Sequence, residues 1–512
     1  MNRITSIVAA TLISIAAVAP AGDVSIDGTY RSSVGTGTPP LEVSSSTHVP
    51  NLNADLLDGM SSADLAPVDH LHAEYPQYVR TVIVSPYLDG GGNQVPMESG
   101  QVLLAALADI TTATEVNPYL VKLEPGIYDL DNLSLYMKEW VDIEGSGRNM
   151  TTIRSRVTTG GDAVVLGADS AEMRSLTLIN MGGGEYVYAI YNDHVSPRFI
   201  DMDVIAYGGS EDNVGIRNEY SSAHIERVSV KAQGGDWSHG ISSIYSSVVM
   251  HNVQVTVINS SLGYNIGIGS TGDSFPIMTD ITVNALGGAT NTGIENSGAD
   301  SYMNNVRVNV SGDDSNKGIV DRGSAAVMSD FEVTVSGGEF NTGFFCESDS
   351  SPFLNNVRVI AANGSNINYG IVSQGCSPKL KGVSVEALGG IHAYGVLNWF
   401  SSQSTLIDVT AKAAGASTYN YAVMNQSEST LRIVNLTAEA YGGSGSFGVY
   451  NSGDGDGLTL DNSDVSGTSN SVRNDNASAD VFVGGSKVNG TLSSNLTCVA
   501  LYDGSYNPVS CP

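Results

Sequence analysis

Four charged residues have the types and the spacing that could do chemistry: Arg307, Asp330, Glu332 and Arg358. Intervals of 25 and 26 residues separate Arg307, Glu332 and Arg358, so in a repeating fold they occupy matched positions on successive units. Two carboxyl groups beside two guanidinium groups could bind an acidic sugar or activate a water molecule. If the protein is an enzyme, we expect these four residues to form its catalytic site.

The same residues also fit a structural role. On adjacent strands, Glu332 would pair with the arginine on either side and form a surface charge ladder. A second column of alternating charge, Glu386, Lys412 and Glu439, has the same spacing without any group that suggests chemistry. Because two such columns occur, we favour the ladder, in which each pair contributes at most about 1 kcal/mol.

A column of Asn and Asp residues runs through the same segment. Its members are Asn252, Asp280, Asn305, Asp330 and Asn356. Acids alternate with amides, which avoids stacking like charges on neighbouring strands. Acids two strands apart are separated by roughly 9.6 Å, too far to share a calcium ion. We therefore expect no metal site and no cofactor here.

The elements that position these side chains are set by an internal repeat. A glycine followed by an apolar residue marks each unit, and intervals of 25 to 27 residues separate the copies. The marker glycines are Gly215, Gly240, Gly267, Gly293, Gly318, Gly343, Gly370, Gly395 and Gly448, with Ala422 in the one missing register. A second marker, Asn or Asp followed by an apolar residue, any residue and Val or Ala, keeps the same period, as at 305–308 and 356–359.

The pattern within each unit is typical of short strands rather than helices. Apolar residues alternate with polar ones, so Val306, Val308 and Val310 are expected to point inward while Arg307 and Asn309 point outward. One unit cannot bury its inner face alone, whereas stacked units pair each strand with its copy one coil away. The sequence therefore predicts an all-β solenoid.

An entry segment at 119–128, followed by 141–147 and 151–153, resembles the first coils of pectinesterase-type helices. With the coil period, this segment makes residues 80–490 similar to the pectin-lyase-like superfamily. The resemblance implies a right-handed parallel β-helix, for which we expect about eleven coils over 79–478. Apolar residues at helical spacing predict a capping helix at Ser99–Ile110, which would cover the open N-terminal end.

The resemblance leaves the activity open. The catalytic segments of pectinesterases, pectate lyases and polygalacturonases are not found in this sequence, and a shared fold does not by itself confer activity. We expect a non-catalytic protein whose polar surface serves adhesion or glycan binding. The alternative is a carbohydrate-active enzyme, namely a polysaccharide lyase, a pectinesterase-like enzyme or a glycoside hydrolase.

The N-terminal region predicts export. Residues 1–21 read as a signal peptide, with Arg3, an apolar run and a small-residue cleavage site. Residues 22–78 are expected to form a linker or surface-protein-like segment. Within it, Asn51–Met60 is similar to a short motif of phage tail fibres and bacterial surface proteins. We therefore expect a bacterial protein that is secreted or held at the cell surface.

Four cysteines fit an oxidising compartment. Cys498 and Cys511 are expected to pair and to hold a C-terminal cap over 479–512, contributing roughly 3 kcal/mol. Cys376 lies three positions beyond the point that matches Cys346 one coil earlier, so that pairing stays open.

The charge balance excludes some partners. The net charge is −30, and the chain has only 23 Lys and Arg residues. Nucleic acid and anionic membrane surfaces need clustered basic residues, so neither is expected as a partner. The apolar run of the predicted signal peptide is short for a membrane span, and the sequence has no other transmembrane candidate. A polysaccharide or a cell-surface glycan remains the expected partner, and the oligomeric state stays open.

Two further columns suggest stacked side chains. Tyr369, Tyr394, Tyr421 and Phe447 share one position on four coils. Alternation places these rings inside the core, although a sugar-stacking platform is the other interpretation. A polar column predicts a ladder at a turn; its members are Asn218, Ser243, Ser270, Asn296, Asp321, Cys346, Ser373, Asn398, Asn425 and Asn451.

Overall fold

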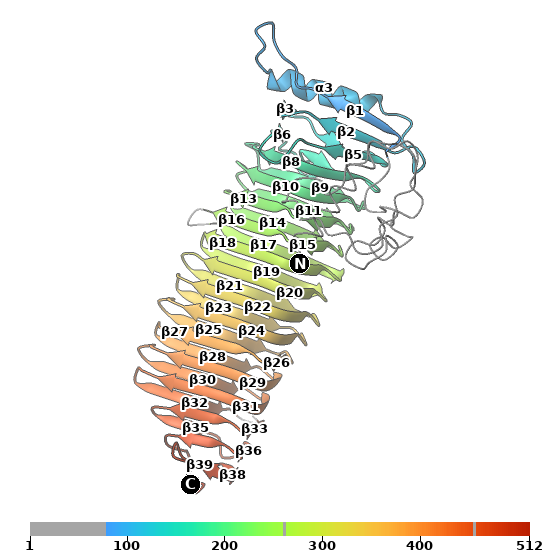
Figure 1. The fold of residues 1–512 in the computed structure, drawn as a ribbon. Helices are drawn as coiled ribbons and strands as arrows, with labels where there is room; N and C mark the ends of the chain where they lie inside the picture. Colours follow the sequence, from blue (N-terminus) through green and yellow to red (C-terminus); the bar gives the residue numbers. More distant parts are fainter. Residues whose placement is uncertain (1–77, 260–262, 454–456) are drawn as a thin grey trace, which may run out of the picture. The chain divides into compact units, whose positions relative to one another are not determined.

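The computed structural model describes residues 78–259, 263–453 and 457–512, all within one compact unit that runs from Pro76 to Pro512. These residues form a right-handed parallel β-helix, as predicted, whose coils stack one on the next (Figure 1). The predicted signal peptide and nearly all of the 22–78 segment lie outside the described residues.

The described strands form two sheets of 26 and 14 strands. The first sheet contains β1 (Arg80–Val84), β2 (Tyr119–Leu123), β3 (Gly126–Asp129), β5 (Val141–Glu144), β6 (Thr151–Ser155), β8 (Glu172–Asn180), β10 (Arg198–Tyr207), β12 (His224–Glu226), β13 (Ser229–Gln233), β15 (Val249–His251), β16 (Gln254–Asn259), β18 (Ile277–Gly287), β20 (Tyr302–Ser311), β22 (Val327–Ser336), β24 (Phe353–Ala362), β26 (Lys379–Lys381), β27 (Ser384–Leu388), β29 (Gln403–Ala414), β31 (Thr430–Tyr441), β33 (Gly457–Asp461), β34 (Asp464–Gly467), β36 (Val481–Gly484), β37 (Lys487–Asn489), β38 (Thr497–Val499), β39 (Leu501–Tyr502) and β40 (Pro508–Val509). The second sheet contains β4 (Leu135–Tyr136), β7 (Val165–Leu166), β9 (Tyr186–Asp193), β11 (Asp212–Glu219), β14 (Trp237–Ile244), β17 (Tyr264–Ser274), β19 (Thr290–Ala299), β21 (Ser315–Arg322), β23 (Phe340–Glu347), β25 (Ile367–Gln374), β28 (His392–Trp399), β30 (Tyr419–Gln426), β32 (Gly445–Ser452) and β35 (Asn470–Asn474).

The number of coils is about fourteen, so the expectation of eleven was too low. The additional coils lie at the two ends, where β4, β7 and β35 carry no glycine marker. Short strands at these ends keep the parallel register of their neighbours, as the pairing of Leu135 with Val165 shows. Counting the marker alone therefore missed them.

The N-terminal end is covered by α3 (Pro96–Asp109), close to the predicted helix. Pro96 begins the helix at a position where a missing N–H costs nothing. Leu103 and Leu107 are buried and belong to the interior core. The helix thus closes the apolar end of the first coils.

The glycine marker has a steric cause. A Cβ atom on Gly318 would lie 2.2 Å from Cγ1 of Val333, which is part of the interior core. The next residue, Ile319, is buried in the same core. Two successive positions therefore face inward, and only glycine fits at the first of them.

One coil shows the compensation that this cause requires. In this coil, Ala422 replaces the marker glycine. The residue that faces Ala422 across the interior is Ala438, which lies two coils beyond Val385 in register. The smaller residue on the opposite wall removes the kind of side-chain contact that Val333 makes at Gly318. The backbone carbonyl of the next coil remains a close neighbour at this position, since the carbonyl oxygen of Ala422 is the nearest atom to a Cβ built on Gly395.

Buried asparagines line the inside of the second sheet. In the predicted polar column, Asn398 donates to Asn425 at 2.7 Å and Asn425 donates to Asn451 at 2.8 Å. This ladder lies within strands rather than at a turn. A second ladder, missed in the sequence, runs through Asn265, Asn291, Asn316, Asn341 and Asn368, with amide contacts of 2.6–3.1 Å.

Two disulfide bonds are present. Cys498 pairs with Cys511, as predicted for the C-terminal end. Cys346 pairs with Cys376, the pairing that the sequence left open. Parallel pairing continues to β39, and β40 then adds an antiparallel strand, which ends the first sheet.

Candidate functional site

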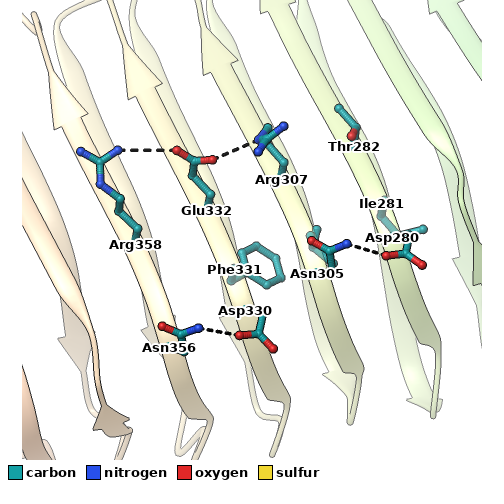
Figure 2. A pocket seen from close by; sticks show the side chains of 11 residues that line it. Asp280, Ile281, Thr282, Asn305, Arg307, Asp330, Phe331, Glu332, Asn356 and Arg358 are labelled. Carbon is teal, nitrogen blue, oxygen red and sulfur yellow. Dashed lines mark hydrogen bonds and ion pairs between the residues drawn. The ribbon is translucent and has the colours of Figure 1, made fainter.

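The four predicted site residues line one shallow groove on the outer face of the first sheet (Figure 2). The groove has a volume of about 490 Å³ and crosses β18, β20, β22 and β24. Alternation in these strands turns Val306 and Val308 into the core and leaves Arg307 exposed. The strand pattern predicted from the sequence therefore positions the charged side chains as expected.

Glu332 is paired on both sides. Its Oε2 lies 3.0 Å from Nε of Arg307, and its Oε1 lies 3.5 Å from Nη1 of Arg358. The register places these three residues directly opposite one another on adjacent strands. The side chains of Arg307 and Arg358 remain 62% and 49% exposed, so water screens both pairs.

The ladder continues beyond the groove. Nη2 of Arg358 lies 3.1 Å from Oε1 of Glu386, although the register places Glu386 opposite Ile360, two residues farther along β24. Arg358 therefore reaches diagonally into the second charge column of the sequence. Glu386 stands opposite Lys412 in that column. The two columns, expected as separate features, form one series of alternating charges.

Asp330 has a different neighbourhood. Its Oδ1 accepts a hydrogen bond from Nδ2 of Asn356, and its Oδ2 accepts one from Nδ2 of Asn304 at 3.4 Å. Within the described part of the chain, no ion pair joins Asp330 to an arginine. The structure thus brings Arg307, Glu332 and Arg358 into contact and leaves Asp330 beside them.

The backbone explains why Asn and Asp occupy this column. Asp330 has a φ of 54° and Asn305 a φ of 51°, in the left-handed region that Asn, Asp and Gly tolerate best. Two coils after Asp330, the same column holds Gly382, with a φ of 61°. Each coil bends here within the first sheet. The residue type is thus accounted for by the bend, without any chemistry.

The acid–amide contact is repeated along the helix. Asn305 donates to Asp280, Asn356 donates to Asp330, and Asn435 donates to Asp408. The last pair lies outside the groove. The environment of Asp330 is therefore a general feature of the bend rather than a special property of the groove.

The aromatic column lies on the outer surface of the second sheet, so the prediction that its rings point inward was wrong. Tyr369, Tyr394, Tyr421 and Phe447 form a continuous stack with centroids 5.0–5.2 Å apart. Toward the N-terminus, the same register position leads to Lys317. Toward the C-terminus, the guanidinium carbon of Arg473 lies 5.2 Å from the centroid of the Phe447 ring, and the side chain of Arg473 is 38% exposed. Tyr421 and Phe447 are buried in a cluster with Val372, Leu397 and Met424 that is separate from the interior core.

The sequence argument failed there because two successive residues, Gly370 and Ile371, both face inward. Counting alternation back from Ile371 therefore assigns Tyr369 to the wrong side. Since the rings stack face to face, each covers its neighbour's π-surface. The column is a stabilising ladder and has little free ring face for a sugar.

A buried charged cluster near the N-terminal end was not found from the sequence. Arg174 contacts Glu144 at 2.7 Å, Glu172 at 2.5 Å and the hydroxyl of Tyr78 at 2.9 Å. Tyr78 donates to Asp142 at 2.7 Å. Burial raises the pKa of Asp142, although hydrogen bonds from Tyr78 and the backbone of Glu172 oppose that effect.

Every member of this cluster has a partner, so its arrangement is that of an anchor. The pKa of Glu144 is lowered, because the hydrogen bonds and charge of Arg174 outweigh the effect of burial. The sequence carried one signal of this cluster: three charged residues recur at one register position on successive coils, namely Lys122, Glu144 and Arg174. Irregular intervals between the first coils hid it.

The described residues offer neither a metal site nor a membrane-spanning helix. They contain no group of three or more His, Cys, Asp or Glu residues arranged to hold a metal ion. None of their helices has the length and apolar character needed to cross a membrane.

Comparisons with known proteins find similarity only among solved structures. No protein family and no curated protein matches the sequence. The A-module of mannuronan C-5 epimerase AlgE6 from Azotobacter vinelandii is 14% identical, over 78% of this chain and 95% of that one, with a TM-score of 0.33. The catalytic domain of a GH87 alpha-1,3-glucanase is 11% identical, over 79% and 65%, with a TM-score of 0.35. The Dettilon tailspike protein is 9% identical, over 82% and 68%, with a TM-score of 0.29. Similarities this low transfer neither an activity nor a ligand to this protein.

Proposed function

We propose that this protein is a secreted or cell-surface β-helix that binds a glycan without cleaving it, through the groove over Arg307, Glu332 and Arg358. The observation that carries the proposal is the double pairing of Glu332. Because both carboxylate oxygens of Glu332 face an arginine, the charges of the groove are explained by their mutual pairing in a surface ladder, without a catalytic role. The predicted signal peptide and the two disulfide bonds support a location outside the cytoplasm.

The groove nevertheless suits a ligand rich in hydroxyl groups. Exposed guanidinium groups donate hydrogen bonds, carboxylates accept them, and the amides of Asn305 and Asn356 do both. These groups repeat at about 4.8 Å along the axis because adjacent strands are that far apart. A chain of sugar residues lying along the axis would meet a regular series of donors and acceptors.

An enzyme is the second candidate function, and one observation favours it. Asp330 and Glu332 place two carboxyl groups in the same groove as two arginines. A polysaccharide lyase, a pectinesterase-like enzyme or a glycoside hydrolase would use such groups as acid, base and charge stabiliser. In that case all four residues would be catalytic.

Incubation of the full chain with neutral and acidic polysaccharides separates the two candidates. Binding is measured by titration calorimetry, and cleavage or elimination by the release of reducing or unsaturated ends. The proposal predicts saturable binding with no new ends. Release of ends by the protein would favour the enzyme, and failure of every polysaccharide to bind would reject the binding function.

A further inference from the structure

An exposed apolar row lies on the first sheet, on the part of each coil that precedes the bend. Ile277, Tyr302 and Val327 are 42%, 47% and 37% exposed, and the two ends of the row are half-buried. Phe275, two residues before Ile277, is 64% exposed. The row contains one apolar residue on each of five successive coils, in the register order Val249, Ile277, Tyr302, Val327 and Phe353. An apolar surface of this extent indicates an interaction site, and it is separate from the groove, which begins at the bend.

Charged residues stand at both ends of the row. The same register position holds His224 at one end and Lys379 at the other. The neighbouring column, two residues farther along each strand, runs from Glu226 to Lys381 through polar residues. Lys381 is exposed and makes no ion pair within the described residues. Counted from Tyr302, the two columns therefore have the same order of residue types in both directions, with opposite charges at Glu226 and Lys381.

We propose that two copies of this chain associate through this row, face to face and antiparallel, with the two-fold axis passing at Tyr302. In a two-fold interface the same patch serves both copies. A residue that lies a given number of coils before Tyr302 therefore faces the residue that lies as many coils after it in the second copy. Ile277 then packs against Val327, and Val249 packs against Phe353. Tyr302 meets its own copy at the axis.

The charges at the ends favour the antiparallel orientation. Antiparallel packing brings Glu226 of each copy against Lys381 of the other, which forms two ion pairs. Parallel packing, in which each coil faces the same coil of the second copy, would leave these two residues far apart along the axis. Phe275 likewise meets Ala325, which is exposed two residues before Val327. One contact opposes the association, since Asp300, two residues before Tyr302, faces its own copy at the exposed rim.

The size and the charge of this face fit a second copy as its partner. The coils from His224 to Lys379, about 4.8 Å apart, and three columns about 6.6 Å apart make a face of roughly 600 Å². Two such faces would together bury roughly 1,200 Å², the lower limit of stable interfaces. The chain has a net charge of −30, so copies repel one another over much of their surface. The row carries no acid between its ends, so self-association is least opposed there.

Sedimentation velocity of the full chain over a series of concentrations tests the proposal. We expect a reversible equilibrium between monomer and dimer, which Tyr302→Ser should weaken at least about tenfold, because both copies lose a ring at the axis. The matched control is Tyr207→Ser, which removes a similarly exposed tyrosine (42%) from β10 of the same sheet and should change nothing. Asp300→Asn should strengthen the dimer, since it removes the like-charge contact. A chain that stays monomeric at every concentration would overturn the proposal.

Exchange of the end charges tests the orientation. Glu226→Lys and Lys381→Glu should each weaken the dimer, because each turns both ion pairs into like-charge contacts. The double variant should regain association, as should an equimolar mixture of the two single variants, because opposite charges face each other again. Thermal unfolding of each variant checks that the fold is intact. Folded variants that do not regain association in either combination would overturn the antiparallel pairing.

Discussion

A Cβ atom on Gly318 would lie 2.2 Å from Cγ1 of Val333, across the interior of one coil. The same close approach recurs in the central coils and explains why glycine marks the repeat. It also makes the packing of two opposite walls interdependent, as the Ala422 and Ala438 coil illustrates.

We expect Gly318→Ala to lower the free energy of unfolding by about 1–3 kcal/mol, because the added methyl group overpacks the core. Val333→Ala should lower it by about 2 kcal/mol by leaving a cavity. The double variant should lose less than the sum, because Val333→Ala removes the nearest side-chain contact of the added methyl group, whereas its contact with the carbonyl oxygen of Gly343 remains. Denaturant unfolding measures the cycle. Gly269→Ala is the matched control on β17, where the nearest atom to the added Cβ lies 3.6 Å away. Additivity of the two changes would contradict this packing account.

The left-handed backbone at Asp330 makes a second prediction. Asp330→Asn and Asp330→Gly should unfold close to wild type, whereas Asp330→Val should cost about 1–3 kcal/mol, since a β-branched residue is strained at a φ of 54°. Thermal and denaturant unfolding measure the series. If the glycine variant were as unstable as the valine variant, the side chain rather than the bend would explain the residue.

A buried acid gives a pH dependence. Asp321 is fully buried in the polar ladder, its Oδ1 accepts from Ser324 at 2.5 Å, and its Oδ2 has no partner among the described groups. Burial raises the pKa of Asp321, and hydrogen bonds from Ser324 and Asn296 only partly oppose this. The protonated form therefore stabilises the fold. That stability is fully present below the unfolded-state pKa of about 3.9 and is lost as pH rises through the folded-state pKa.

At a pH above the folded-state pKa of Asp321, Asp321→Asn should be more stable than wild type by roughly 1–3 kcal/mol, because it removes a buried charge with an unpartnered oxygen. As pH falls towards 4, the difference should shrink. Denaturant unfolding across this range measures it, with the exposed Asp313→Asn as a control of equal charge change. A stability difference independent of pH would show that Asp321 keeps its ordinary pKa.

The period of the sequence predicts most of the fold, because strands can stack in register only if the sequence pattern repeats once in every coil. Glu332 between Arg307 and Arg358 follows from counting one repeat in each direction, and the structure places the three residues in that order. The first and last coils could not be counted in this way because they are short and lack the glycine marker.

Side-chain direction was predictable only where alternation holds. It fails at Gly370 and Ile371, which both face inward, and this put Tyr369 on the wrong side. The bend at Asp330 was also missed, although the presence of Gly382 in an Asn and Asp column indicates a left-handed backbone. Arg432 on β31 is exposed and makes no ion pair within the described residues, because no acid lies close to it in space, and spacing along the chain does not give that.

The ladder at Glu332 tests the central claim most directly. Glu332→Gln keeps the shape of the side chain and removes its charge, with Glu439→Gln as the control outside the groove. The account predicts that wild type and Glu332→Gln both release no ends from any polysaccharide, and that Glu332→Gln unfolds with a free energy lower by at most about 1 kcal/mol. Polysaccharide cleavage by wild type that disappears in Glu332→Gln at unchanged thermal stability would contradict it.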